Sequence, residues 1–188
     1  MLAVKKGQFL PATILLIAAI ASTSYASRRN LESRSLSEGK NDLLQVGVEA
    51  PNWTLRGADG RAVQLSSLRG KVVVLDFWAT WCGPCTQMMP QMQLLQDQYR
   101  ERGLVVLGVN SWEEKDPSAM MAKKGASYTL LLNGESIANN YGVKLLPVIY
   151  IIGRDGKIFY RHEGAEKRLR MVIEECLGLA DPSVPVPQ

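Results

Sequence analysis

Residues 72–85 read VVVLDFWATWCGPC, and this stretch decides the fold. It opens with a short β-branched run at 72–75, which is typical of a strand buried on both faces of a sheet. It ends in WCGPC at 81–85, and residues 86–102 then carry apolar side chains at helical spacing. The two cysteines therefore fall where a buried strand passes into a helix.

This position favours thiol chemistry. Unsatisfied N–H groups at the start of a helix stabilise negative charge, so a cysteine there is biased toward the thiolate that attacks disulfides. Pro84 would lie just inside the helix, where a missing N–H costs little. We expect Cys82 to be the exposed nucleophile and Cys85, one turn into the helix, to be the more buried resolving thiol. A mixed disulfide would form at Cys82 and be released by Cys85.

The segment FWATWCGPC resembles the active site of thioredoxin, and its surroundings resemble the TlpA-like branch of secreted or membrane-tethered oxidoreductases. A Leu-x-Gly-Lys phrase at 68–71 favours this branch over plain thioredoxin. The resemblance spans about residues 47–178. It implies an α/β thioredoxin-like fold, with a central mixed sheet flanked by helices and an N-terminal β-hairpin extension. It also implies a redox disulfide between Cys82 and Cys85.

The resemblance implies a substrate-binding surface around the cysteine pair. Leu146 and Pro147 precede a second apolar run. In the family this proline is cis and faces the cysteines, and the residue before it offers its backbone to the substrate as a strand edge does. Trp81, Gly83 and Pro84 flank the pair and would complete this surface.

Asp76 interrupts the buried strand six residues before Cys82. A buried carboxyl group is costly unless it has a partner or a role. The family position is the acid that helps to move the proton of the resolving cysteine through water, and an ion pair with Lys71 or Lys157 is the alternative. Many TlpA-like proteins have asparagine there, so Asp76 resembles thioredoxin itself.

The chain divides into four predicted segments. Residues 1–26 have a positive start, an apolar stretch too short for a typical spanning helix, and small residues before a cleavage point. They predict a signal peptide, with an uncleaved signal anchor as the alternative. Residues 27–45 predict a flexible linker, 46–179 the thioredoxin-like domain, and 180–188 a Pro-rich tail. Either form of the first segment places the domain outside the cytoplasm.

The bulk composition limits the possible classes of function. The length of 188 residues and the hydrophobic content of 46% suit one globular domain with short extensions. A net charge of +4 is too small to argue for nucleic acid. With three cysteines and one histidine in the chain, the pair lacks the four ligands of structural zinc. We expect no metal, no cofactor and a monomer, with Cys176 as a buried free thiol rather than a third redox or intermolecular cysteine.

The predicted function is that of an extracytoplasmic thiol–disulfide oxidoreductase that reduces protein disulfides. The Gly-Pro dipeptide between the cysteines resembles that of a reductant, and the family implies a membrane electron donor and clients such as cytochrome c maturation factors or misoxidised proteins. A disulfide oxidase or isomerase remains open. So does a Cu(I) metallochaperone that uses Cys82 and Cys85 as soft ligands. A thiol peroxidase would need a lone peroxidatic cysteine in its own loop context, which the sequence does not show.

Overall fold

The computed structural model describes residues 43–179. The segments predicted at 1–26 and 180–188 lie outside these residues, as does most of the linker predicted at 27–45. Leu43, the first described residue, has its side chain buried in the core. Within the described part of the chain, no helix is long and apolar enough to cross a membrane.

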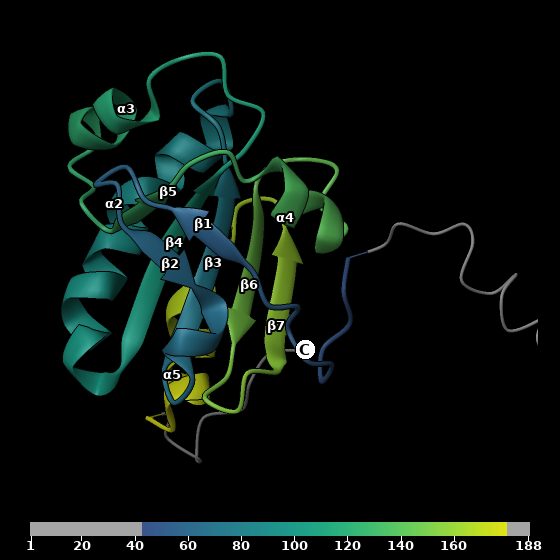
Figure 1. Ribbon diagram of the computed structural model, residues 1–188. Helices are drawn as coiled ribbons and strands as arrows, with labels where there is room; N and C mark the ends of the chain where they lie inside the picture. Colours follow the sequence, from purple (N-terminus) through teal and green to yellow (C-terminus); the bar gives the residue numbers. More distant parts are fainter. Residues whose placement is uncertain (1–42, 180–188) are drawn as a thin grey trace, which may run out of the picture. The chain divides into compact units, whose positions relative to one another are not determined.

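A five-stranded mixed sheet forms the centre of the described domain, and the cysteine motif follows its middle strand (Figure 1). The strand order is β5-β4-β3-β6-β7. Strand β3 (Val72–Trp78) is parallel to β4 (Leu104–Asn110), which is parallel to β5 (Thr129–Leu131). On its other side β3 is antiparallel to β6 (Val148–Ile152), which pairs with β7 (Ile158–Glu163) as a hairpin. All seven residues of β3 are buried, as its apolar run predicts.

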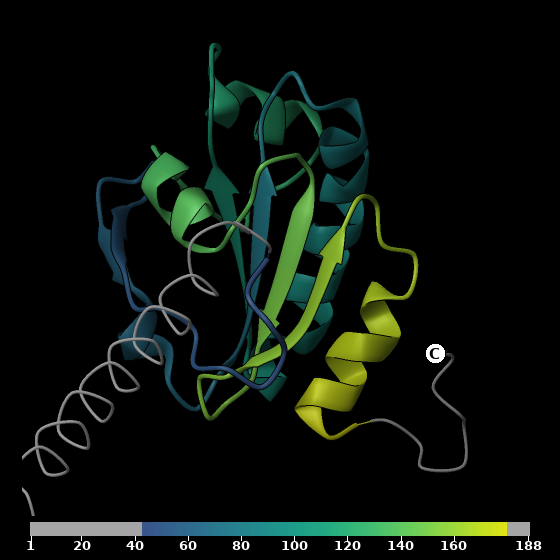
Figure 2. The same cartoon turned by 90° about the vertical axis from the view of Figure 1, so that its right-hand side faces the viewer.

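Helices cover both faces of this sheet because β3 is apolar on both sides. Its alternate residues Val72, Val74 and Trp78 pack in a core with α2 (Gly83–Tyr99) and α5 (Leu169–Leu177). Val73, Leu75 and Phe77 pack in a second core with α4 (Glu135–Asn140) and with residues 43–53. Figure 2 shows α5 on one side of the sheet and α4 on the other. The predicted sheet flanked by helices is confirmed.

The predicted N-terminal β-hairpin is present as a separate two-stranded sheet. Strand β1 (Thr54–Arg56) pairs antiparallel with β2 (Ala62–Gln64). A short 3-10 helix, η1 (Leu65–Leu68), then leads into β3. The remaining short helices are η2 (Arg100–Arg102), which ends α2, and α3 (Pro117–Lys123), which Asp116 caps.

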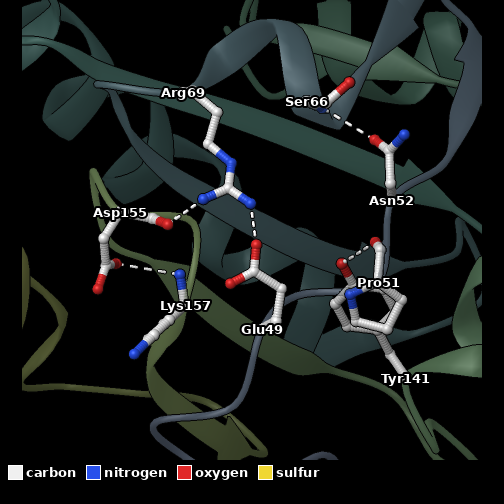
Figure 3. Close-up of polar contacts among 8 residues, drawn as sticks. All are labelled: Glu49, Pro51, Asn52, Ser66, Arg69, Tyr141, Asp155 and Lys157. Carbon is white, nitrogen blue, oxygen red and sulfur yellow. Dashed lines mark hydrogen bonds and ion pairs between the residues drawn. The ribbon is translucent and has the colours of Figure 1, made fainter.

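Polar contacts hold the start of the described chain, residues 43–53, against the rest of the domain (Figure 3). The guanidinium of Arg69 pairs with Glu49 and donates to the carbonyl oxygen of Asp155 in the β6–β7 turn. The hydroxyl of Tyr141, at the end of α4, donates to the carbonyl oxygen of Pro51 at 2.9 Å. These bonds join three parts of the chain that are far apart in sequence.

The last helix begins later than its sequence pattern indicates. The sequence pattern predicts a helix over residues 166–177, whereas α5 begins at Leu169. The Glu166 side chain is buried, accepts a hydrogen bond from the Tyr160 hydroxyl and accepts another from the backbone N–H of Arg168 at 2.6 Å. These bonds occupy Glu166 in a turn before the helix, so helical spacing alone misplaced the boundary.

Candidate active site

The cysteine pair sits at the N-terminus of α2 and is joined by a disulfide bond. Cys82 is the N-cap residue, and its Sγ accepts a hydrogen bond from the backbone N–H of Cys85 at 3.3 Å. Pro84 lies in the first turn, where no intrahelical bond requires its missing N–H. The free N–H groups of this turn favour negative charge on the capping sulfur.

Cys82 is less exposed than the sequence suggested. Its residue is 5% exposed and Cys85 is fully buried, so the expected order of exposure holds, while the expectation of an exposed nucleophile does not. The disulfide bond to the buried Cys85 holds Cys82 against the core cluster to which both cysteines belong. The accessible rim consists of its neighbours: Gly83 and Pro84 are exposed, and Trp81 is 54% exposed.

The Leu146–Pro147 bond is cis, as the resemblance implied. Strand β6 runs antiparallel to β3, and Val148 at its start lies opposite Phe77 near the end of β3. The loop before β6 and the motif after β3 therefore lie at the same end of the sheet. Leu146 is half-buried and packs against the core cluster that contains the cysteine pair.

Asp76 is a buried carboxyl group on the face of the sheet that α2 covers. It is 1% exposed, and the Tyr128 hydroxyl donates to its Oδ2 at 3.4 Å. Burial raises the pKa of Asp76 to about 7, against the opposing effect of the Tyr128 hydrogen bond. Within residues 43–179 Asp76 forms no ion pair, so the alternative of a partner at Lys71 or Lys157 is wrong. The buried partner is a neutral phenol.

Glu113 was not singled out from the sequence, yet it organises the loop before the cysteines. One carboxylate oxygen accepts from the backbone N–H of Thr80 at 2.8 Å and from the side-chain amide of Asn110 at 2.8 Å, and the other accepts from the Thr80 hydroxyl at 2.6 Å. Burial alone would raise its pKa, but these hydrogen bonds dominate and lower the pKa to about 2. The signal was available: parallel β3 and β4 end at the same edge, which brings the loops after them together.

The exposed ring of Trp81 is fixed by the same loop. Its indole Nε1–H donates to the carbonyl oxygen of Trp112 at 2.7 Å. Trp112 has a φ of +54°, a left-handed conformation that is unfavourable for a bulky residue. Its backbone N–H donates to the Glu135 carboxylate at 2.7 Å, which holds this turn from the first residue of α4.

Comparison with known proteins identifies the family. The AhpC/TSA family model matches residues 46–161. The chain belongs to the AhpC/TSA family. It is 35% identical over 120 residues to the thiol-disulfide oxidoreductase ResA of Bacillus anthracis. The aligned region covers 62% of this chain and 69% of that protein. It is 34% identical over 132 residues to the thioredoxin-like protein YneN of Bacillus subtilis, which covers 68% of this chain and 77% of that protein.

Solved structures agree with this assignment. A Chlorobium tepidum protein designated thiol:disulfide interchange protein DsbE has a TM-score of 0.66 and 35% identity, over 72% of this chain and 99% of that one. The exposed lipoprotein thioredoxin Etrx1 of Streptococcus pneumoniae has a TM-score of 0.56 and 28% identity, over 68% of this chain and 98% of that one. This member of the AhpC/TSA family has a thioredoxin-like fold and is a thiol–disulfide oxidoreductase.

The cis-proline loop of this AhpC/TSA protein carries one further exposed apolar residue. Leu145 precedes the cis-proline pair and is 73% exposed. A single exposed leucine carries no signal in a sequence, because much of any protein surface is apolar. Its neighbour Leu146 packs against the core cluster that contains the cysteine pair, so Leu145 belongs to the loop at the cysteine end of the sheet.

Cys176 does not join the cysteine pair. It is a free thiol on α5 and half-buried, and burial raises its pKa to about 11. A thiol with so high a pKa carries little thiolate at neutral pH and reacts slowly with disulfides. Cys176 is thus a free thiol within the described residues, as expected, but it is half-buried rather than buried.

Proposed function

We propose that this oxidoreductase reduces disulfides of protein clients outside the cytoplasm. The observation that carries the proposal is the Cys82–Cys85 disulfide at the start of α2, with the exposed Trp81 and Pro84 beside it and a cis-proline loop at the same end of the sheet. The Gly-Pro pair between the cysteines leaves no charged side chain in the loop that they close. We assign Cys82 as the nucleophile and Cys85 as the resolving thiol, because Cys82 caps the helix and Cys85 is fully buried.

The reaction starts from the reduced pair. The Cys82 thiolate attacks one sulfur of the client disulfide, forming a mixed disulfide and releasing the other client sulfur as a thiolate, which takes a proton. The Cys85 thiol then loses its proton to the carboxylate of Asp76 through water. The Cys85 thiolate attacks Cys82 Sγ and expels the second client sulfur. Two electrons pass to the client, and the Cys82–Cys85 disulfide forms.

Client binding uses the backbone of the cis-proline loop. We assign Leu146 as the residue that pairs with an extended client segment, with Pro147 ordering the loop. Trp81, Gly83 and Pro84 form the opposite side of the surface. Leu145 and Trp81 are exposed apolar side chains, so this surface suits a client segment with apolar residues beside its cysteine.

The proposed cellular setting rests on the sequence of residues 1–26 and on one structural neighbour. The sequence at 1–26 predicts export or a signal anchor, and the S. pneumoniae neighbour is an exposed lipoprotein thioredoxin. A reductant outside the cytoplasm requires a source of electrons, which we assign to a membrane dithiol protein that reduces the Cys82–Cys85 disulfide. Clients of the cytochrome c maturation class fit this setting, and the domain at 46–179 acts as a monomer.

The reduction potential of the cysteine pair tests the direction of transfer. We expect a value near that of thioredoxin, about −270 mV, in glutathione and dithiothreitol buffers. A value near that of DsbA, about −120 mV, would instead assign an oxidase or isomerase. Absence of any reversible two-electron couple would contradict the proposal and favour Cu(I) binding. Cys82→Ser is the control, since it cannot form the disulfide bond whose potential is measured.

A further inference from the structure

Tyr128 is the only described side chain that forms a hydrogen bond with the Asp76 carboxyl group. It lies just before β5, is 4% exposed, and reaches Asp76 across β4. The other carboxyl oxygen, Oδ1, has no hydrogen-bond partner among residues 43–179. The two oxygens of this buried carboxyl group therefore differ: Oδ2 accepts a hydrogen bond from Tyr128, and Oδ1 accepts none from the described residues.

The backbone leaves room for this contact at one position. In the parallel pairing of β3 with β4, Asp76 lies opposite Gly108. A Cβ on Gly108 would lie 3.0 Å from the Tyr128 ring and 2.9 Å from the indole nitrogen of Trp78. Both rings therefore lie against the bare backbone of β4 beside Asp76, and the glycine permits that approach.

Helix α2 holds the backbone of Tyr128, at the opposite end of the residue from its hydroxyl. The side-chain oxygen of Gln93 accepts from the backbone N–H of Ser127 at 2.7 Å and from that of Tyr128 at 3.0 Å. Gln93 belongs to the same helix that carries both cysteines. The helix that presents the resolving thiol thus also sets the position of the phenol on the acid.

We propose that Tyr128 is a positioning residue for proton transfer by Asp76: its hydroxyl holds Oδ2, stabilises the carboxylate and leaves Oδ1 to accept the proton of Cys85. The inference deepens the proposed reduction and rests on it. A hydrogen bond from a neutral donor favours the charged form of an acid. Without it, burial would keep Asp76 protonated to still higher pH and unable to act as a base at neutral pH.

Few other groups compete for this role. At the positions that flank Asp76 in the sheet, β4 presents Gly108 and β6 presents Ile149. From α5, the residues packed on this face are apolar apart from the half-buried thiol of Cys176, and α2 contributes the two cysteines and Tyr99, whose hydroxyl bonds Glu174. The pKa of Asp76 responds to burial and to Tyr128. Among the described residues, Tyr128 is therefore the adjustable part of this environment.

The test is Tyr128→Phe, which removes the hydroxyl and keeps the ring. We expect the titration midpoint of the Asp76 carboxyl carbon, followed by 13C NMR, to rise by about one pH unit. Insulin reduction should slow roughly fivefold at pH 7 and recover at pH 9, because a one-unit rise lowers the carboxylate fraction by about this factor near neutral pH. An unchanged midpoint, or equal slowing at every pH, would overturn the inference.

Three controls separate this role from a merely structural one. Tyr99→Phe removes another core hydroxyl, one that bonds Glu174, and should leave the pH profile unchanged. Adding Tyr128→Phe to Asp76→Asn should have no further effect on the profile, whereas an independent effect would contradict the coupling. If Tyr128→Phe unfolds, 3,5-difluorotyrosine at position 128, a stronger donor, should lower the midpoint, and a rise would contradict the inference.

The two proposals fail in different ways. If the wild-type protein does not reduce insulin at any pH, the proposed function is wrong, while the carboxyl titration still tests the bond between Tyr128 and Asp76. If the protein reduces insulin and the variant moves neither the midpoint nor the profile, the function stands and the role of Tyr128 is wrong.

Discussion

Single residues set the chemistry of this site through their burial. Asp76 and Glu113 are both carboxyl groups near the cysteine pair, and their pKa values move in opposite directions. Burial raises the pKa of Asp76 to about 7, because the one hydrogen bond from Tyr128 offsets only part of the effect of burial. Several hydrogen bonds to Glu113 overcome its partial burial and lower its pKa to about 2. Asp76 can therefore exchange protons near neutral pH, whereas Glu113 stays charged and acts as a structural anchor.

Replacing Asp76 by asparagine should alter how stability depends on pH. The pKa of Asp76 is about 7 in the folded chain, whereas an unperturbed aspartate has a pKa of about 3.9, so between these values the folded protein binds the proton more tightly. The free energy of unfolding should therefore fall as pH rises from about 4 to about 7, by at most on the order of 4 kcal/mol.

Asp76→Asn should remove this dependence and be the more stable protein at pH 8. Urea unfolding of the oxidised protein and the variant at pH 4.5, 6 and 8 measures the difference. If the difference in free energy of unfolding between the wild type and the variant stays constant over this range, the pKa of Asp76 is not raised by burial, and the prediction is wrong. Insulin reduction by the variant should be slow at every pH.

At the scale of elements, the site depends on loops that follow neighbouring strands. The loop after β3 carries Thr80 and Trp81, and the loop after β4 carries Trp112 and Glu113. Side-chain bonds join the two loops: Glu113 binds Thr80, and the Trp112 carbonyl binds Trp81. The second loop thus determines where the exposed indole stands beside the disulfide.

Glu113→Gln should loosen this junction. The amide keeps one acceptor oxygen but loses the charge that strengthens the bonds to Thr80 and Asn110, so we expect a loss of about 1–2 kcal/mol in the free energy of unfolding at pH 7. Because the folded pKa lies below that of the unfolded chain, this difference should disappear as pH falls from about 4.5 to about 2.

The KM for insulin should rise more than kcat falls, since Trp81 loses its fixed position. Glu114→Gln is the matched control, because it removes the same charge from the next residue, which is exposed. Equal losses of stability in the two variants would show that net charge, rather than the bonds of Glu113, is responsible.

At the scale of the whole described domain, long-range polar contacts tie the N-terminal segment to the far end of the sheet. Arg69 precedes β3 and bonds both Glu49 and the turn between β6 and β7 (Figure 3). Gly156 in that turn has a φ of +79°, and a Cβ there would run into the Arg69 guanidinium. The glycine thus serves both the turn and the contact that spans the domain.

Gly156→Ala should therefore destabilise the protein by more than backbone strain alone. Gly60→Ala is the matched control, because Gly60 has a φ of +80° with open space around its Cβ position. We expect about 1 kcal/mol from strain in each variant and about 1–2 kcal/mol more at Gly156 from the displaced Arg69. Thermal or urea unfolding measures both, and equal losses would show that Arg69 shifts without cost.

Local sequence was sufficient for most of the fold. The strand at 72–78, the helix after the cysteines and the hairpin before η1 all correspond to patterns in short stretches, whereas the cis bond at Pro147 was implied by the family resemblance. Apolar period and turn residues act over a few neighbours, so they can be interpreted without knowing what packs against them. The late start of α5 shows the limit, because a partly buried hydrogen bond from the Tyr160 hydroxyl of β7 holds Glu166 outside the helix.

The sequence by itself determined the fold, the cysteine chemistry and the presence of a buried acid at position 76. Only the tertiary structure decided what that acid touches: Tyr128 lies 52 residues away in the chain and meets Asp76 across Gly108. The same holds for Glu113 beside Thr80 and for the low exposure of Cys82. These features depend on which strands become neighbours and which side chains then share a buried space, and no local pattern encodes that.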